Sequence, residues 1–366
     1  MAIPCGRQAF KASTPVTTMS APRRQVFPNI QTGLTARGLE MNISVIICTY
    51  TEERWDILVS AITSVQQQST PPYEIIVVSD NNPALAARLR AQFTGISVAE
   101  NNGIRGISPA RNTGIALASG DIVAFIDDDA IAGRDWLFHL ARCYEDRRVL
   151  GVGGKVLPEW ADKRPQWFPE EFDWTIGCSY RGLPRKVSPV RNFIGCNMSF
   201  RGEVFSIVGG FQDDLGRVAA NPGGCEETDL CIRIGNRWPA GILLYEPKAV
   251  VRQVIPASRE KLRYFLSRCF LEGRSKAHLA RLVGSRVGLS SERAYTFRTL
   301  PSGMALGLYD TVAHRNWHGM ARMGAILLGL LYTTMGYLLA SGAPKSGRTL
   351  SPQNPFSFVH PARSEK

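Results

Sequence analysis

Cysteine and histidine are scarce in this sequence, and neither forms a pattern typical of metal binding. The 366 residues contain eight Cys and five His, and no two Cys are spaced as CxxC. Cysteines this few and scattered exclude a disulfide-stapled scaffold and disfavour a structural zinc site. We expect most of them to be reduced, buried thiols, because free Cys is among the most buried residue types.

An apolar segment of signal-peptide length is also missing from the N-terminal region. Residues 1–40 are rich in Ser, Thr, Pro, Gln and Arg and show no sustained apolar periodicity, so they do not indicate secretion. We predict a disordered tail here. Met41 directly precedes the first strand-like run and is a candidate functional start.

Acidic residues are few towards the C-terminus. The net charge of +12 divides into +4 for residues 1–40, −3 for 41–256, +8 for 257–343 and +3 for 344–366. Positive charge beside an apolar run favours an anionic membrane surface. Nucleic acid is the alternative partner, but no nucleic-acid-binding motif accompanies the charge, and we expect no nucleic acid to bind.

The sequence does contain a regular alternation of short apolar runs and helical repeats. Runs rich in β-branched residues predict buried strands, and they lie at 43–49, 74–79, 96–99 and 122–126. Helical spacing predicts helices between them, at 55–68, 84–93 and 108–119. This order is typical of an α/β domain with a Rossmann-like, mostly parallel sheet. Its ligands are expected at the carboxyl ends of the strands.

The amino-acid composition changes after residue 150. Residues 151–200 are rich in Gly, Pro and Trp and predict loops with mixed strands. Short helices are expected at 206–210 and 226–234, and one more strand within 241–251. We assign 41–256 to one α/β domain, which is a natural size for a single domain.

A helical extension is predicted after the domain. Residues 257–322 form a basic, amphipathic region, which we expect at a membrane interface. Met323–Ala343 contains no charged residue and is just long enough to cross a bilayer, which takes about 20 residues. It predicts a transmembrane or an interfacial helix, followed by a disordered tail at 344–366.

Three adjacent carboxylates, Asp127-Asp128-Asp129, follow the strand-like run IVAFI. Clustered carboxylates repel one another unless a cation offsets them, and carboxylate oxygens suit hard cations such as Mg²⁺ and Mn²⁺. If the strand geometry continues through the triplet, Asp127 and Asp129 point to the same side. The alternative interpretation is a solvated acidic turn or a helix start.

A second acidic cluster, Glu226-Glu227-Thr228-Asp229, opens an expected helix about 100 residues later. A carboxylate at a helix start can serve only as a cap. Together with the first cluster it suggests a divided site, in which one cluster holds a cation and phosphates and the other supplies a general base.

The run 43–252 resembles the family 2 glycosyltransferases of the GT-A fold. The resemblance rests on the order of six segments: VIICTYTEER, EIIVVSDNN, NNGIRGISPARNTGIALASGD, FIDDD, NFIGCNMSFRGEVFSIVGGFQDDLG and CEETDLCIR. The C-terminal extension resembles that of a membrane-attached subset which acts on polyprenyl-linked acceptors. The resemblance implies a nucleotide-sugar-binding domain with a catalytic face towards the cytosol, where nucleotide sugars are found.

The resemblance also implies roles for individual residues. Those expected to bind the nucleotide sugar are Thr49, Tyr50, Glu52, Asp80, Arg111, Asp127 and Asp128. Asp129, with Asp127, is expected to bind a divalent metal, Mn²⁺ or Mg²⁺, that bridges the diphosphate.

On the acceptor side, the resemblance places Asn197 and Asp229 where the donor sugar and the acceptor meet, and Glu227 at the catalytic base. Relatives often have Asp at the position of Glu227, so Glu226 remains the alternative base. Relatives also often carry a His after the late strand, where this chain has Arg252-Gln253.

We therefore expect a metal-dependent, inverting glycosyltransferase that uses a nucleotide-diphosphate sugar, most plausibly a UDP-sugar, and a polyprenyl-linked or other glycolipid acceptor at a membrane. One alternative is a polyprenyl-phosphate monosaccharide synthase. Another is a catalytically silent, membrane-associated nucleotide-sugar-binding protein, which the two intact acidic clusters disfavour. A nucleotidyltransferase is disfavoured because the chain has no Gly-rich, Lys-bearing triphosphate loop.

Overall fold

The computed structural model describes residues 41–213, 215–218, 221–222, 224–283 and 295–342. The predicted tails, 1–40 and 344–366, and the last residue of the predicted apolar run lie outside the described residues. The described part begins with the first predicted strand.

The first half of the central sheet is parallel, as predicted, in the order β3-β2-β1-β4. Its strands are β1 (Ile43–Thr49), β2 (Glu74–Asp80), β3 (Ser97–Asn101) and β4 (Ile122–Asp127). The connecting helices are α1 (Trp55–Gln66), α2 (Pro83–Gln92) and α3 (Ile107–Leu117). The predicted bounds differ from these by at most two residues, because the apolar runs and helical repeats are long and regular.

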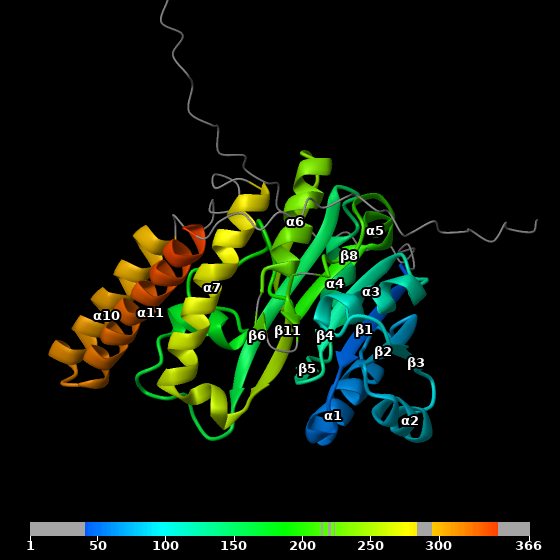
Figure 1. The fold of residues 1–366 in the computed structure, drawn as a ribbon, viewed down its shortest axis with the longest axis horizontal. Helices are drawn as coiled ribbons and strands as arrows, with labels where there is room; N and C mark the ends of the chain where they lie inside the picture. Colours follow the sequence, from blue (N-terminus) through cyan, green and yellow to red (C-terminus); the bar gives the residue numbers. More distant parts are fainter. Residues whose placement is uncertain (1–40, 214, 219–220, 223, 284–294, 343–366) are drawn as a thin grey trace, which may run out of the picture. The chain divides into compact units, whose positions relative to one another are not determined.

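The second half of the sheet is mixed and continues β4-β8-β6-β11-β5. The strands are β5 (Ala130–Ala132), β6 (Val149–Trp160), β8 (Asn197–Arg201) and β11 (Ile242–Ile255), with β7 (Ser188–Pro189) paired to β11. β8 is antiparallel to both β4 and β6, whereas β11 is parallel to β6. Figure 1 shows the sheet running from β3 to β6 and β11. The predicted mostly parallel α/β sheet is confirmed.

The region 151–200, for which loops and mixed strands were expected, opens within the long strand β6. Gly151 and Gly153 lie in this strand, and a Cβ atom at either position would overlap the ring of Phe193. Glycine normally weakens a strand and marks a close approach of another group. The glycines that suggested irregular structure here accommodate an aromatic ring against the strand.

Helices cover both faces of the sheet. Buried side chains of α1, α2 and α4 (Trp136–Cys143) join one apolar cluster, and those of α3, α5 (Gly202–Val208) and α6 (Glu226–Arg237) join the other. Successive residues of β1 alternate between the two clusters, as strand geometry requires. The remaining short elements are η1 (Glu52–Arg54), η2 (Glu170–Ile176), η3 (Ala257–Glu260), η4 (Tyr295–Thr299), β9 (Arg217–Val218) and β10 (Asn221–Pro222).

Three helices follow the sheet: α7 (Leu262–Val283), α10 (Leu300–Ala313) and α11 (His318–Ser341). Phe265 of α7 is fully buried in the main core cluster, so this helix is part of the domain's packing. α11 packs along α7, and α10 packs against α11 (Figure 1). Among the described residues, α11 is the one helix long and apolar enough to cross a membrane.

Candidate active site

A cavity of about 610 Å³ lies where β1, β2 and β4 end, which is the edge where ligands of parallel α/β sheets bind. Nine of the twelve residues predicted from the sequence line it. They are Thr49, Tyr50, Asp80, Arg111, Asp127, Asp128, Asp129, Glu226 and Glu227. Two acidic clusters about 100 residues apart in the sequence thus face one space.

Asn197 does not line the cavity, contrary to the expectation that it contacts the sugars. Its side chain is fully buried. Its Nδ2 donates to the carbonyl oxygens of Lys155 and Ala249 at 3.1 and 2.9 Å, and its Oδ1 accepts from Trp136 Nε1 at 2.8 Å. With the amide engaged at both ends, Asn197 holds strands together and offers no group to a substrate.

Glu52 and Asp229 also lie outside the cavity lining. The Glu52 carboxylate is 3.4 Å from Arg88 on the surface, and both side chains are 45% exposed. Asp229 Oδ2 lies 2.8 Å from Arg233 Nε, one turn further along α6. Neither prediction of a substrate contact holds in this structure, because both carboxylates turn towards arginines outside the site.

The Asp triplet does not continue the strand. β4 ends at Asp127, and Asp128 and Asp129 form the turn that leads into β5. The expectation that Asp127 and Asp129 share one side through strand alternation is therefore wrong. Instead Asp128 and Asp129 share a cation, because Arg54 Nη1 lies 3.1 Å from an oxygen of each.

Burial makes the ionised form of Asp128 unfavourable. Its carboxylate is almost fully buried, and burial, opposed by Arg54 and reinforced by Asp129, raises its pKa to about 7. Thr49 Oγ1 donates a hydrogen bond of 2.8 Å to Asp128 Oδ2. The triplet thus holds more negative charge than its protein partners readily stabilise.

Besides Arg54, Asp129 is contacted by two further residues that sequence reasoning did not assign to the site. Gln253 Nε2 donates to Asp129 Oδ1 at 3.2 Å, and Arg259 Nη2 lies 3.5 Å from Asp129 Oδ2. Arg259 lines the cavity, and its Nη1 is buried without a hydrogen-bond partner among the described residues. Such an unsatisfied buried donor calls for an explanation, and an anionic ligand in the cavity provides one.

The position of Gln253 follows from strand pairing. In the β11–β5 pair it is opposite Ala130, the residue directly after the Asp triplet. Of the pair Arg252-Gln253, where the family resemblance leads one to expect a His, it is Gln253 that contacts Asp129. A sequence that does not reveal register cannot show this contact.

The donor set fits a metal ion only if the substrate completes it. Among the described residues no group of three His, Cys, Asp or Glu side chains is placed to hold a metal. Mg²⁺-type ions are commonly bound by one or two carboxylates together with substrate phosphates. Asp129 and Asp127 match such a partial set of hard oxygen ligands, which a diphosphate would complete.

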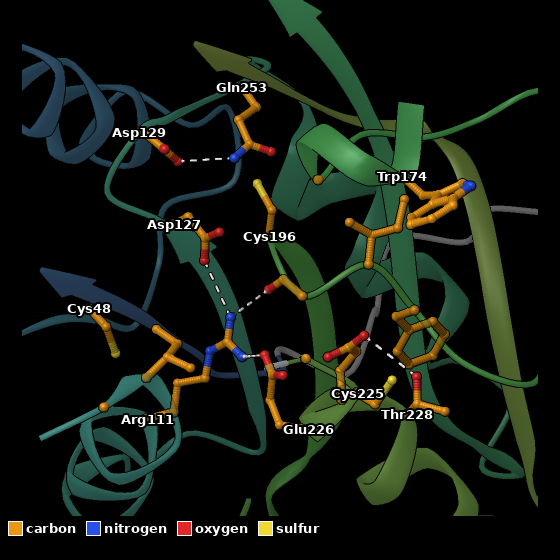
Figure 2. Close-up of a pocket in the computed structure, with 18 of the residues that line it drawn as sticks. Cys48, Arg111, Asp127, Asp129, Trp174, Cys196, Cys225, Glu226, Thr228 and Gln253 are labelled. Carbon is orange, nitrogen blue, oxygen red and sulfur yellow. Dashed lines mark hydrogen bonds and ion pairs between the residues drawn. The ribbon is translucent and has the colours of Figure 1, made fainter. Parts of the chain in front are cut away.

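A buried guanidinium joins the two acidic clusters. Arg111 Nη1 lies 3.0 Å from Glu226 Oε1, and its Nη2 lies 3.3 Å from Asp127 Oδ1 and 3.1 Å from the carbonyl oxygen of Gly195. Figure 2 shows Arg111 between Asp127 and Glu226. Burial opposes its charge, but the two carboxylates hold the pKa of Arg111 above its ordinary value. Glu226 is therefore engaged in an ion pair.

Glu227, by contrast, forms no ion pair with an arginine in the part of the chain that the structure describes, and it lines the cavity. Burial and the neighbouring Glu226 raise the pKa of Glu227 well above its ordinary range. A carboxylate of raised proton affinity that faces a cavity is the arrangement a general base needs. The backbone just before α6 is unusual, since Cys225 has a left-handed φ of 73°, a strain often found at functional sites.

Asp80 is held rigidly at the end of β2. Its Oδ1 accepts from Asn101 Nδ2 at 2.6 Å, and its Oδ2 accepts from the Gly106 backbone N–H at 2.9 Å. The next residue, Asn81, has a left-handed φ of 52°. The strand end and its turn thus fix a carboxylate at the cavity wall.

Helix α7 supplies a second wall. Arg268, Glu272 and Lys276 are spaced by four residues, which puts them on one helix face, and all three line the cavity. The basic, amphipathic region predicted for a membrane interface therefore turns part of its charged face towards the site. Lys276 Nζ lies 6.0 Å from the ring centroid of Trp174, another residue that lines the cavity.

Formal charges around the cavity balance. Among the described residues that line it, seven are acidic and seven are basic. Each phosphoryl group of a nucleotide-diphosphate sugar brings a negative charge, and a divalent cation restores the balance. The cavity thus offers basic side chains to phosphate oxygens and carboxylates to a divalent cation.

Comparisons with known proteins agree with this geometry. The model of the family described as Glycosyl transferase family 2 matches residues 44–208. The chain is 36% identical over 240 residues to glucosyl-dolichyl phosphate glucuronosyltransferase of Haloferax volcanii, covering 64% of this chain and 76% of that protein. The chain belongs to the family 2 glycosyltransferases. It is thus a glycosyltransferase, similar to a member of the subset that its C-terminal extension suggests.

A second relative and a solved structure extend the comparison. Succinoglycan biosynthesis protein ExoM of Rhizobium meliloti is 26% identical over 248 residues, covering 65% of this chain and 75% of that protein. The mannosyltransferase PcManGT of Pyrobaculum calidifontis, solved with GDP-Man and Mn²⁺, has a TM-score of 0.50 and 18% identity, covering 80% of this chain and 87% of that chain. This similarity confirms the predicted GT-A fold of the glycosyltransferase.

The pairing of Glu226 predicts a difference in stability between two neighbouring variants. Glu226→Gln leaves the buried Arg111 with one carboxylate fewer, and we expect it to lower the free energy of unfolding by about 3 kcal/mol. Glu227→Gln removes a charge that burial disfavours. Because the folded-state pKa of Glu227 is raised, wild-type stability falls as pH rises through that pKa, and Glu227→Gln should reduce this fall. Denaturant unfolding between pH 5 and 8 measures both effects, and equal losses in the two variants would contradict the assignment.

Proposed function

We propose that this glycosyltransferase is metal-dependent and inverting, and that it transfers a sugar from a nucleotide-diphosphate donor, most plausibly a UDP-sugar, to a polyprenyl-linked or other glycolipid acceptor. The observation that carries this proposal is the pairing pattern of the two acidic clusters. Arg111 engages Asp127 and Glu226, which leaves Glu227 facing the cavity as the candidate base. The cluster at Asp128 and Asp129 is held by arginines that a diphosphate can attract.

The proposed chemistry is a single displacement. Glu227 accepts the proton of the acceptor hydroxyl while its oxygen attacks the anomeric carbon. The bond between that carbon and the diphosphate breaks, and the electron pair leaves with the diphosphate. No covalent intermediate with the protein is needed, and attack from the side opposite the leaving group inverts the anomeric configuration.

Charge on the departing diphosphate requires stabilisation. A divalent ion held by Asp129 and Asp127 would act as a Lewis acid on the diphosphate oxygens. Arg259 lies beside Asp129 with a buried N–H group that has no partner among the described residues. We assign this group to a phosphate oxygen of the donor, since a guanidinium presents its donors in a fork that matches phosphate.

The acceptor is expected on the side of the cavity formed by α7 and the aromatic residues Trp174, Tyr180 and Tyr295. Trp174 Nε1 donates to Tyr295 Oη at 2.9 Å, which fixes the indole ring. Flat aromatic faces suit the CH faces of a sugar or a lipid stem. The Haloferax volcanii relative is named for a dolichyl phosphate-linked sugar, which supports a lipid-linked acceptor here.

Membrane association fits this acceptor. The apolar helix α11 packs on α7, the helix that lines the cavity. Nucleotide sugars are cytosolic, so we expect the catalytic domain to face the cytosol. A polyprenyl-phosphate monosaccharide synthase remains the alternative function, and a phosphate acceptor would need no strong base.

Donor binding tests the function directly. We expect UDP or GDP to raise the melting temperature of the wild-type protein, and Mn²⁺ to increase that shift. Asp129→Asn should lose the part of the melting-temperature shift that depends on Mn²⁺ and keep the part that the nucleotide causes without metal. The same variant should also transfer sugar more slowly from a matching nucleotide sugar to a lipid-linked acceptor. The absence of any nucleotide effect on the wild type, with or without metal, would contradict the proposal.

Replacement of the base should separate binding from turnover. Glu227→Gln is expected to bind the donor as the wild type does and to lose about 100- to 10,000-fold in turnover. In the wild type, turnover should rise with pH through the raised pKa of Glu227, because only the deprotonated carboxylate accepts a proton. If Glu227→Gln is active and Glu226→Gln is inactive, the general base is Glu226 and not Glu227. Activity in both variants would favour a phosphate acceptor.

Arg259 should discriminate a diphosphate from a monophosphate. In EDTA, we expect the wild type to bind UDP or GDP more tightly than the corresponding monophosphate, and Arg259→Gln to lose roughly ten-fold or more of that preference. Arg252→Gln is the matched control, because Arg252 lies on the preceding strand, 60% exposed and paired with Glu159. Calorimetric titration of the three proteins with the two nucleotides gives the six affinities. A uniform loss for both nucleotides would indicate a structural role for Arg259.

A further inference from the structure

Helix α11 has two opposite faces of different character. One face is buried and includes Ala325, Ile326, Gly329 and Gly336. The other is apolar and exposed, and its spacing of three and four residues makes one stripe. The stripe consists of Leu327, Leu328, Leu331, Met335, Leu338 and Leu339. The helix thus packs on the protein with one face and exposes an apolar stripe on the other.

The buried face of α11 is fixed to α7 at backbone contact. A Cβ atom on Gly273 would overlap the carbonyl oxygen of Thr333, and one on Gly336 would overlap that of Phe270. Such small-residue crossings allow helices to approach closely. Because α7 also lines the cavity with Arg268 and Lys276, α11 cannot cross a bilayer in this arrangement without taking charged residues into the hydrocarbon, which is costly.

Helix α10 extends the exposed apolar surface. Its 14 residues measure about 21 Å, which is too short for a hydrocarbon core of about 30 Å. Leu308, Tyr309 and Val312 are at least half exposed. The single charged residue of α10, Asp310, forms an ion pair with Arg322 of α11.

The connection between the two helices carries residues typical of a membrane–water boundary. Trp317 is 78% exposed, and Trp is enriched at that boundary. Arg315 stands beside it, and residues 257–343 carry a net charge of +8. An anionic leaflet complements this charge, and its acyl region complements the uncharged stripe.

We propose that α10 and α11 lie in the plane of one bilayer leaflet, with the exposed stripe in the acyl region, and that the chain does not cross the membrane at α11. Of the two arrangements that the sequence leaves open for this helix, transmembrane and interfacial, the proposal selects the interfacial one. It rests on the packing of α11 against α7 and not on the sugar chemistry. The experiments below therefore test it separately from the proposed function.

Membrane topology tests this arrangement in the full-length protein. An epitope tag is added after Lys366, and sealed membrane vesicles of both orientations are treated with protease. We expect the tag and the catalytic domain to be cleaved in the same preparation, because both lie on one side. Cleavage of the tag in one preparation and of the domain in the other would show that α11 crosses and would overturn the proposal.

Flotation with vesicles tests the stripe itself. We expect Leu331→Asp combined with Leu338→Asp to reduce binding of the protein to vesicles of phosphatidylglycerol and phosphatidylcholine roughly ten-fold or more. The two substitutions remove leucine side chains that would otherwise be buried in the acyl region. Leu117→Asp is the control, since Leu117 is 52% exposed on α3, away from the stripe. Circular dichroism and the UDP or GDP melting shift report whether the variants fold.

The alternative occupant of the stripe is a second copy of the chain. If the double variant binds vesicles as the wild type does but changes from dimer to monomer in analytical ultracentrifugation, the stripe is a self-association surface and the proposal is wrong. Loss of vesicle binding without a change in sedimentation supports it.

Discussion

The geometry of the site depends on the ion pairs that the buried guanidinium of Arg111 forms. It reaches Asp127 at the end of β4 and Glu226 at the start of α6, so it ties the sheet to a helix that follows about 100 residues later. An unpaired charge at this depth would be strongly unfavourable. The ion pairs therefore constrain both acidic clusters at once, and of the two glutamates that line the cavity they engage Glu226 and not Glu227.

A second balance of charge surrounds the Asp triplet. Arg54 and Arg259 both approach Asp129, and Arg54 also reaches Asp128. Without substrate these arginines offset carboxylates that would otherwise repel each other in a buried turn. A diphosphate offers them better partners, and a metal ion offers the carboxylates one. The same side chains can thus stabilise the free protein and bind the donor.

The sequence predicted the parallel half of the fold, and most of the site residues that it predicted line the cavity, because regular apolar periodicity and the family resemblance both bear on those segments. It did not reveal contacts that depend on register or on side-chain direction. Gln253 reaches Asp129 through the pairing of β11 with β5, and Asn197 points into the core. Arg259 follows β11 in a short 3₁₀ turn, where no local pattern distinguishes it from its basic neighbours.

Helix α7 contacts three different parts of the molecule. It buries Phe265 in the core, lines the cavity with Arg268 and Lys276, and carries α11 on a glycine crossing. Because α7 is common to all three, a displacement of α11 would be passed to one wall of the cavity. Under the proposed in-plane arrangement, the leaflet that holds α11 would therefore have a mechanical path to the geometry of sugar transfer.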